Sequence, residues 1–130
     1  MPVILNRVER FNPFLKIRKW YLTLRSVSLV SESTVAKQIA DETTLNRKEA
    51  EMALAQFEKV LIANLLSSNS VKMGDWGSFH LTCNSASADA KEDLGAKDVK
   101  GLNIRFVPGK ALREAISKAS FVFAEDLMSR

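Results

Sequence analysis

The sequence predicts a domain of the α+β class, in which helices and antiparallel strands occupy separate stretches of the chain. Three observations favour this class: two capped helix starts between residues 31 and 66, short strand patterns between residues 71 and 107, and a Pro-Gly pair that begins a last helix. The chain has 130 residues, of which 46% are hydrophobic. This size and composition fit one folded domain with an added arm, and they argue against an intrinsically disordered chain.

The first thirty residues are predicted as an N-terminal extension that contains a β-strand. We expect residues 1–13 to be irregular, with Asn12-Pro13 as a turn. Residues 14–30 are rich in β-branched and aromatic side chains and contain no Gly or Pro, so they predict one long strand or two short ones. Because apolar and charged residues alternate imperfectly in this run, an edge strand suits it best.

Two helices are expected next. Ser31 is a good N-cap, and the apolar residues that follow it recur at helical spacing. Asn46 and Glu49 have the spacing of a capping box, which begins a second helix that runs to about Leu66. The apolar stripe of this second helix consists of Ala50, Ala53, Leu54, Phe57, Val60, Leu61 and Leu65.

Three strands follow the helices. They are expected over residues 71–73, 76–83 and 99–107, with a tight turn at Gly74-Asp75. Residues 84–98 are small and polar, so the last two strands form a long hairpin whose arm spans about residues 82–104.

Pro108-Gly109-Lys110 begins the last helix, because proline pre-sets the helical φ angle. Phe121–Phe123 could dock back onto the domain as a short segment. The predicted domain therefore spans residues 31–123, and residues 124–130 are expected to be a tail.

Charge is unevenly distributed along the chain. Residues 1–30 hold six basic groups and one acid, which gives +5, whereas residues 31–130 hold 13 basic and 14 acidic groups, which gives −1. This asymmetry indicates a polyanionic partner, although basic edge strands also prevent aggregation. No apolar run exceeds four residues and the first residues carry no apolar stretch of signal-peptide length, so we expect no membrane association and a cytoplasmic location.

The sequence contains no recognisable catalytic or metal-binding constellation. His80 and Cys83 are the single residues of their types, and in a strand they fall on opposite faces. Residues 74–77 lack the lysine and the spacing of a phosphate-binding P-loop. We therefore expect a non-enzymatic protein with no metal, no cofactor and no small-molecule substrate.

Two segments carry motifs that match a known family in order and spacing. Residues 71–79 (VKMGDWGSF) look like V-x-L-x-G-F-G-x-F, and residues 106–112 (FVPGKAL) look like F-x-P-G-K-x-L. With two helices before the first motif and a long hairpin between the motifs, residues 31–119 resemble the HU/IHF family of bacterial histone-like DNA-binding proteins. The basic extension looks like that of a divergent HU-like subgroup of Bacteroidetes-type bacteria.

The resemblance implies an HU/IHF-like fold: two N-terminal helices, a three-stranded antiparallel sheet with a long β-arm, and a C-terminal helix, here with an extra N-terminal strand. It also implies an intertwined homodimer whose two arms reach around duplex DNA and enter the minor groove. A proline at the tip of each arm would kink the duplex. Between Cys83 and Asn103, however, this chain has no proline and no arginine, and three lysines face four acids. We therefore expect no proline wedge in this arm, and we expect the basic extension to supply part of the electrostatic contact.

The residues expected to contact DNA lie in four parts of the chain. At Gly109 and Lys110, the start of the last helix is expected to offer free backbone amides to a phosphate. The full set is Lys72, Ser78, Arg105, Gly109, Lys110 and Arg113 on the expected saddle, Lys91, Lys97 and Lys100 on the arm, Lys16, Arg18, Lys19 and Arg25 in the extension, and Arg47 at the second helix. For each of the basic residues the competing interpretation is a solvated surface charge.

The function expected from this reasoning is nucleoid-associated, architectural DNA binding and DNA condensation, largely independent of sequence and made through phosphate and minor-groove contacts. Two alternatives stay open. One is a dimeric scaffold that has lost DNA binding, which the acidic arm favours. The other is single-strand or RNA binding by the aromatic and basic segment around Trp20 and Tyr21.

Overall fold

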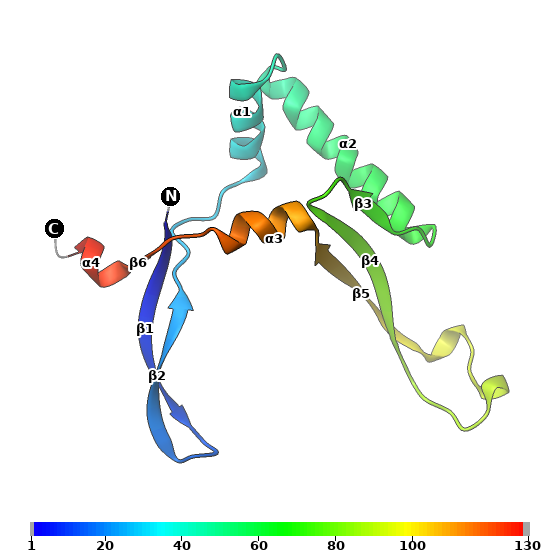
Figure 1. Ribbon diagram of the computed structural model, residues 1–130. Coiled ribbons are helices and arrows are strands. Elements are labelled where there is room, and N and C mark those ends of the chain that lie inside the picture. The colour runs from blue at the N-terminus through cyan, green and yellow to red at the C-terminus, as the bar shows by residue number, and fades with distance from the viewer. Residues whose placement is uncertain (1, 129–130) are drawn as a thin grey trace. The chain divides into compact units, whose positions relative to one another are not determined.

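The computed structural model describes residues 2–128, and it confirms the α+β class (Figure 1). The described chain forms two compact units. The first consists of residues 1–30 together with residues 115–130, and the second of residues 31–114. None of the helices within residues 2–128 is both long and apolar enough to cross a bilayer.

The first unit is a three-stranded sheet with a short helix. Strands β1 (Val3–Asn12) and β2 (Ile17–Leu24) form an antiparallel hairpin, and β6 (Phe121–Phe123) pairs with β1 in parallel. The order of the strands is β2-β1-β6, and α4 (Ala124–Met128) follows β6 directly.

Two expectations for this unit were wrong. Residues 3–12 are a strand instead of an irregular segment, because β1 gains its hydrogen bonds from β2 and from β6, which lies more than a hundred residues away in the sequence. The segment expected as a tail after residue 123 begins with α4, which packs on β1. The turn expected at Asn12-Pro13 is confirmed, and it joins two strands of one hairpin.

The two expected helices open the second unit. The N-cap of α1 (Glu32–Glu42) is Ser31, whose hydroxyl accepts a hydrogen bond from the Thr34 N–H at 3.3 Å. The N-cap of α2 (Arg47–Leu66) is Asn46, whose side chain accepts from the Glu49 N–H at 2.8 Å. The Glu49 carboxylate accepts in turn from the Asn46 N–H at 3.1 Å, so the capping box is confirmed.

An antiparallel sheet completes the second unit. Its strands are β3 (Val71–Met73), β4 (Gly77–Ser85) and β5 (Val99–Pro108), in the order β3-β4-β5, and all three lie within two residues of the expected bounds. Between β4 and β5 the hairpin ends in two single 3-10 turns, η1 (Lys91–Asp93) and η2 (Ala96–Asp98). Helix α3 (Lys110–Ser117) begins two residues after β5.

The second unit buries little apolar surface within one chain. Across the described residues, the buried hydrophobic side chains are Ala36, Ala50, Leu65 and Ala124, none of which is large and fully enclosed. On α2, Ile62 and Leu66 are 49% and 69% exposed, and on β5 Ile104 is 61% exposed. Contiguous exposed apolar surface of this kind marks an interaction site in a soluble protein.

Candidate nucleic-acid interface

The β3–β4 turn and the start of α3 lie against each other. Gly74 has a φ of +54°, the left-handed conformation that glycine adopts without strain, and it lets the chain reverse between β3 and β4. The Gly109 N–H donates to the Trp76 carbonyl at 2.8 Å, and the Ala111 N–H donates to the Asp75 carbonyl at 2.9 Å. Hydrogen bonds thus join the two motifs that are 30 residues apart in the sequence.

This geometry corrects one expectation about α3. The amides of Gly109 and Ala111 are not free for a phosphate, because carbonyl groups of the β3–β4 turn already accept from them. Glycine is required at residue 109 for another reason: a Cβ atom there would overlap the carbonyl group of Asp75. Gly109 therefore positions α3, and the cationic side chain next to it, Lys110, is the group that could meet an anion.

A hollow of about 190 Å³ lies where these segments meet. Four of the residues expected to contact DNA line it, namely Lys72, Ser78, Gly109 and Lys110. The remaining lining comes from the β3–β4 turn and the end of β5, and it includes Asp75. Lys110 also forms an exposed ion pair with Glu114 at 3.9 Å, an interaction weak enough to exchange for a phosphate.

The sheet next to this hollow has one polar face and one apolar face. Since residues that pair across antiparallel strands point to the same side, the register places Lys72 opposite Ser78 and His80 opposite Arg105 on one face. Phe79 opposite Phe106 and Leu81 opposite Ile104 occupy the other face. The polar face thus combines two cations with hydrogen-bonding side chains.

His80, for which the sequence predicted no catalytic or metal-binding role, forms hydrogen bonds with two serine side chains. Its Nε2 atom lies 2.8 Å from the Ser78 hydroxyl, and its Nδ1 atom lies 2.9 Å from the Ser70 hydroxyl. The three side chains form a hydrogen-bonded row beside Arg105 on the polar face. The spacing of Ser78 and His80 by two residues in a strand is the signal in the sequence that could have revealed it.

Aromatic packing holds the opposite face in place. Phe79 and Phe106 have ring centroids 5.1 Å apart, and Trp76 lies 6.3 Å from Phe79 and 5.9 Å from Phe106. Gly77 is needed here because a Cβ atom at this residue would overlap the Phe106 ring. This cluster fixes the twist and register on which the alignment of Lys72, Ser78 and Arg105 depends.

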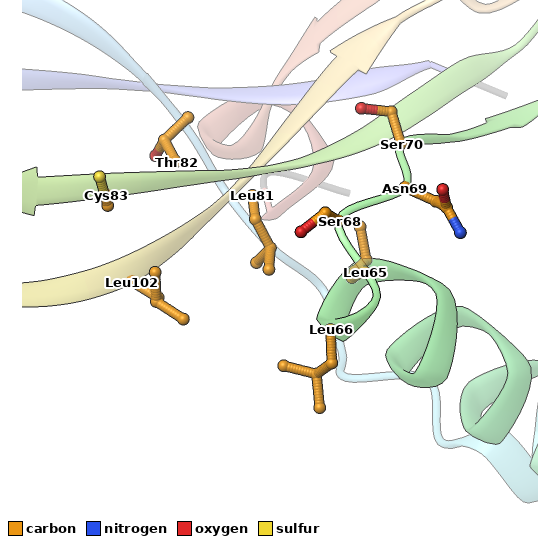
Figure 2. Close-up of a pocket in the computed structure, with 9 residues that line it drawn as sticks. All are labelled: Leu65, Leu66, Ser68, Asn69, Ser70, Leu81, Thr82, Cys83 and Leu102. Atoms are coloured by element: carbon orange, nitrogen blue, oxygen red, sulfur yellow. The ribbon is translucent and has the colours of Figure 1, made fainter. Parts of the chain in front are cut away.

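The apolar side of the second unit contains a further hollow, of about 370 Å³ (Figure 2). Leucine side chains from the end of α2 and from β4 and β5 lie around it, as Figure 2 shows for Leu65, Leu66, Leu81 and Leu102. Its lining also includes Ser68, Asn69, Ser70 and Thr82, and it contains no cation.

The other expected contact residues are not brought to the polar face. Lys91 and Lys97 lie in η1 and η2, beyond the last strand pair Ser85–Val99 at the far end of the hairpin, and Lys100 follows that pair directly. Arg47 donates to the Ser33 hydroxyl and lies 3.2 Å from the Glu51 carboxylate, so its charge is already matched. Arg113 is exposed on α3.

The cations of the extension lie in the first unit. Lys16 is in the turn of the β1–β2 hairpin, Arg18 and Lys19 follow it on β2, and Arg25 comes directly after β2. Arg18 lies 3.8 Å from Glu9, the one acid of the first thirty residues. Within residues 2–128 there is no group of three or more His, Cys, Asp or Glu side chains that could hold a metal ion.

Comparisons with known proteins agree with this architecture. Residues 10–122 match the family model described as "HU domain fused to wHTH, Ig, or Glycine-rich motif". No curated protein sequence matches the chain.

Two solved structures share the fold. A candidate DNA-binding protein of Bacteroides vulgatus ATCC 8482 superposes with a TM-score of 0.67 at 15% identity, over 94% of this chain and 48% of that one. The present chain therefore spans about half the length of that protein. Anabaena HU, solved as a complex with DNA, superposes with a TM-score of 0.54 at 16% identity, over 68% of this chain and 98% of that one.

Proposed function

Because the chain belongs to the family of HU domains fused to wHTH, Ig or glycine-rich motifs, we propose that it is a non-enzymatic protein that binds duplex DNA. The observation that carries this proposal is the polar face of the β3-β4-β5 sheet. Lys72 and Arg105 share this face, and Lys110 lines the hollow next to it. We assign these three cations to the DNA phosphates.

Phosphate contacts account for binding that is largely independent of sequence. Cations that neutralise phosphates release condensed counterions, which supplies affinity without reading the bases. The hydroxyl of Ser78 and the ring of His80 add hydrogen bonds that position the backbone, as polar side chains do in most protein–DNA interfaces. Such a protein bends or condenses DNA in the bacterial nucleoid and has no need of a cofactor or substrate pocket.

A homodimer is the second part of the proposal. One chain leaves Ile62 and Leu66 of α2 and Ile104 of β5 largely exposed, although a soluble monomer rarely keeps such an apolar surface. A second copy of the chain would cover it, and the two polar faces would then act together on one duplex. Intertwining of the two copies belongs to this proposal, as does contact of the two arms with the minor groove.

The arm is expected to contribute less to affinity than the polar face. Lys91, Lys97 and Lys100 are its cations, and the four acids of the same stretch outnumber them. Repulsion between these acids and the phosphates offsets the attraction of the lysines. The arm therefore acts through its shape, or it remains away from the duplex.

Duplex binding across a salt series tests the proposal. We would measure fluorescence anisotropy of a labelled duplex of about 30 base pairs with the full chain. The double variant Lys72→Gln/Arg105→Gln should weaken binding and make the salt slope shallower by about 3.6, since the proposed dimer loses two cations from each subunit and each phosphate contact contributes about 0.9. The matched control is Lys37→Gln, which removes an exposed cation of α1 that pairs with Asp41 at 3.7 Å, and it should leave the slope unchanged.

The contrary outcomes point to the two alternatives. No binding of duplex at low salt would favour a dimeric scaffold that keeps the fold without DNA. Tighter binding of a single strand than of the duplex at the same salt would favour recognition by the aromatic and basic segment around Trp20 and Tyr21.

A further inference from the structure

Strands β1 and β2 form a hairpin that ends in a turn (Figure 1), and this turn carries an exposed aromatic side chain. Residues 13–16 form the turn, and Phe14 within it is 94% exposed. Phe11, on β1 just before the turn, is 60% exposed. An aromatic ring in the turn is not needed to protect the edge of the sheet from aggregation, because charged side chains and proline are sufficient for that. The ring of Phe14 is therefore accessible to a ligand.

Hydrogen bonds hold the backbone of the turn, including that of Phe14, in a defined conformation. The side-chain Oδ1 atom of Asn12 accepts from the N–H of Phe14 at 2.9 Å and from the N–H of Leu15 at 3.2 Å. The carbonyl oxygen of Asn12 accepts from the N–H of Lys16 at 2.8 Å. Three hydrogen bonds to one residue organise the turn, so little conformational entropy remains to be lost when the tip binds.

Cations surround this ring. Arg10 pairs across the hairpin with Lys19, Arg18 pairs with Phe11, and Lys16 lies in the turn itself. Only Arg18 has an acid near it, Glu9 at 3.8 Å, among the ion pairs of residues 2–128. The hairpin tip, defined here as residues 10–19, therefore carries four positive charges and no acid.

The aromatic residues of the tip also form a common surface. Phe11, Phe14 and Tyr21 line one open hollow of about 280 Å³, together with Arg10 and Pro13. Aromatic rings with a neighbouring arginine offer a surface on which a nucleobase stacks. A two-stranded ribbon of this kind is narrow enough to enter a groove of the duplex.

We propose that the hairpin tip is a DNA wedge, in which Phe14 inserts between two base pairs from the minor groove. The four cations of the tip contact the flanking phosphates. Insertion unstacks one base step and kinks the duplex, and Asn12 keeps the ring aimed at that step. This inference rests on the proposed duplex binding and adds a second contact, made by the first unit, to that of the polar face.

Two other occupants of the tip are less consistent with its chemistry. A second copy of the same tip is disfavoured because four positive charges would face four others. An anionic membrane shares the phosphate chemistry, so vesicles containing anionic lipid are included in the test. DNA is favoured because the tip combines four positive charges with aromatic side chains on which bases stack.

The test compares Phe14→Ala with Leu29→Ala in the full chain. Leu29 is 97% exposed and lies outside the hairpin, so both substitutions remove an apolar side chain that supports no packing. Equal melting temperatures of the two variants and the wild type would verify the fold. DNA bending is read from energy transfer between dyes at the two ends of a duplex, and unstacking from the fluorescence of 2-aminopurine placed along it.

The wedge predicts that wild type and Leu29→Ala bend the duplex and raise 2-aminopurine fluorescence equally. Phe14→Ala should lose most of both signals and bind about tenfold more weakly, as loss of one stacking contact would cause, with an unchanged salt slope.

If Phe14→Ala binds, bends and unstacks like the wild type, the wedge is wrong while the proposed function stands. If wild type does not bind duplex, the proposed function fails first. If Phe14→Ala weakens binding to the vesicles and leaves the DNA bend unaltered, the tip is a membrane contact instead.

Discussion

The backbone N–H of Gly109 donates to the carbonyl oxygen of Trp76 at 2.8 Å, and together with the bond from the Ala111 N–H to the Asp75 carbonyl it ties the start of α3 to the β3–β4 turn. Because the two segments touch through their backbones, Lys110 and Lys72 come to line the same hollow. The proposed phosphate contact therefore depends on a close approach that only glycine at residue 109 allows.

Gly109→Ala should destabilise the fold by about 2–4 kcal/mol, since the new methyl group would overlap the Asp75 carbonyl and push α3 away from the turn. Gly101→Ala is the matched control, because a Cβ at Gly101 meets nothing within 4 Å and the expected change is within about 0.5 kcal/mol. Urea denaturation followed by circular dichroism measures both. Equal midpoints for the two variants would show that the contact between α3 and the turn is dispensable.

The proposed dimer makes a prediction on α2. Ile62 is 49% exposed in a single chain, so Ile62→Lys should cost a monomer almost nothing. If a second copy covers this surface, the same substitution buries an unpaired charge and shifts the protein to monomers. Sedimentation velocity reads the outcome, with Gln56→Lys, which adds the same charge at an exposed residue on another side of the same helix, as the control. A dimer that survives Ile62→Lys as well as Gln56→Lys would place the interface elsewhere.

The sequence predicted the second unit better than the first, and the reason is physical. Capping by Ser31 and Asn46 and the turn at Gly74 are local, and the signals for them lie within a few residues of the elements they begin. The parallel pairing of β1 with β6 could not be predicted locally, because β6 comes from the other end of the chain and no window of sequence contains both strands. The longer pairing of β1 with β2 is a local hairpin, and this part of the first unit was missed because residues 1–13 were expected to be irregular. The alternation of residues along β4 and β5 predicted the face on which Arg105 lies. It did not predict that the Gly109 N–H donates to the Trp76 carbonyl, because this hydrogen bond is a tertiary contact.

The attachment of β6 to β1 rests in part on Arg7. Its guanidinium lies 3.6 Å from the centroid of the Phe123 ring and forms an ion pair with Glu125. Both groups of the ion pair are about half exposed, so we expect Arg7→Gln to cost only about 1 kcal/mol. Hydrogen exchange should become faster at the amides of β6, whereas Arg10→Gln, on the same strand, should leave them unchanged. Unaltered exchange in Arg7→Gln would mean that the strand pairing alone holds β6.

The acids of the β4–β5 arm make the last prediction. Glu92 and Asp93 lie in η1 near the arm's end, and their charges oppose any approach of the arm to phosphates. Glu92→Gln/Asp93→Asn should therefore tighten duplex binding and steepen its salt dependence, because the three lysines of the arm would then outnumber its two remaining acids, Asp89 and Asp98. Asp98 is kept in this variant because its carboxylate accepts from the Gly95 N–H at 2.8 Å and shapes the turn.

The matched change on α1, Asp41→Asn/Glu42→Gln, alters the net charge equally at a place outside the arm. If both variants raise affinity by the same factor, net charge explains the gain and the arm does not touch DNA. A larger gain for the arm variant would show that the arm lies against the duplex.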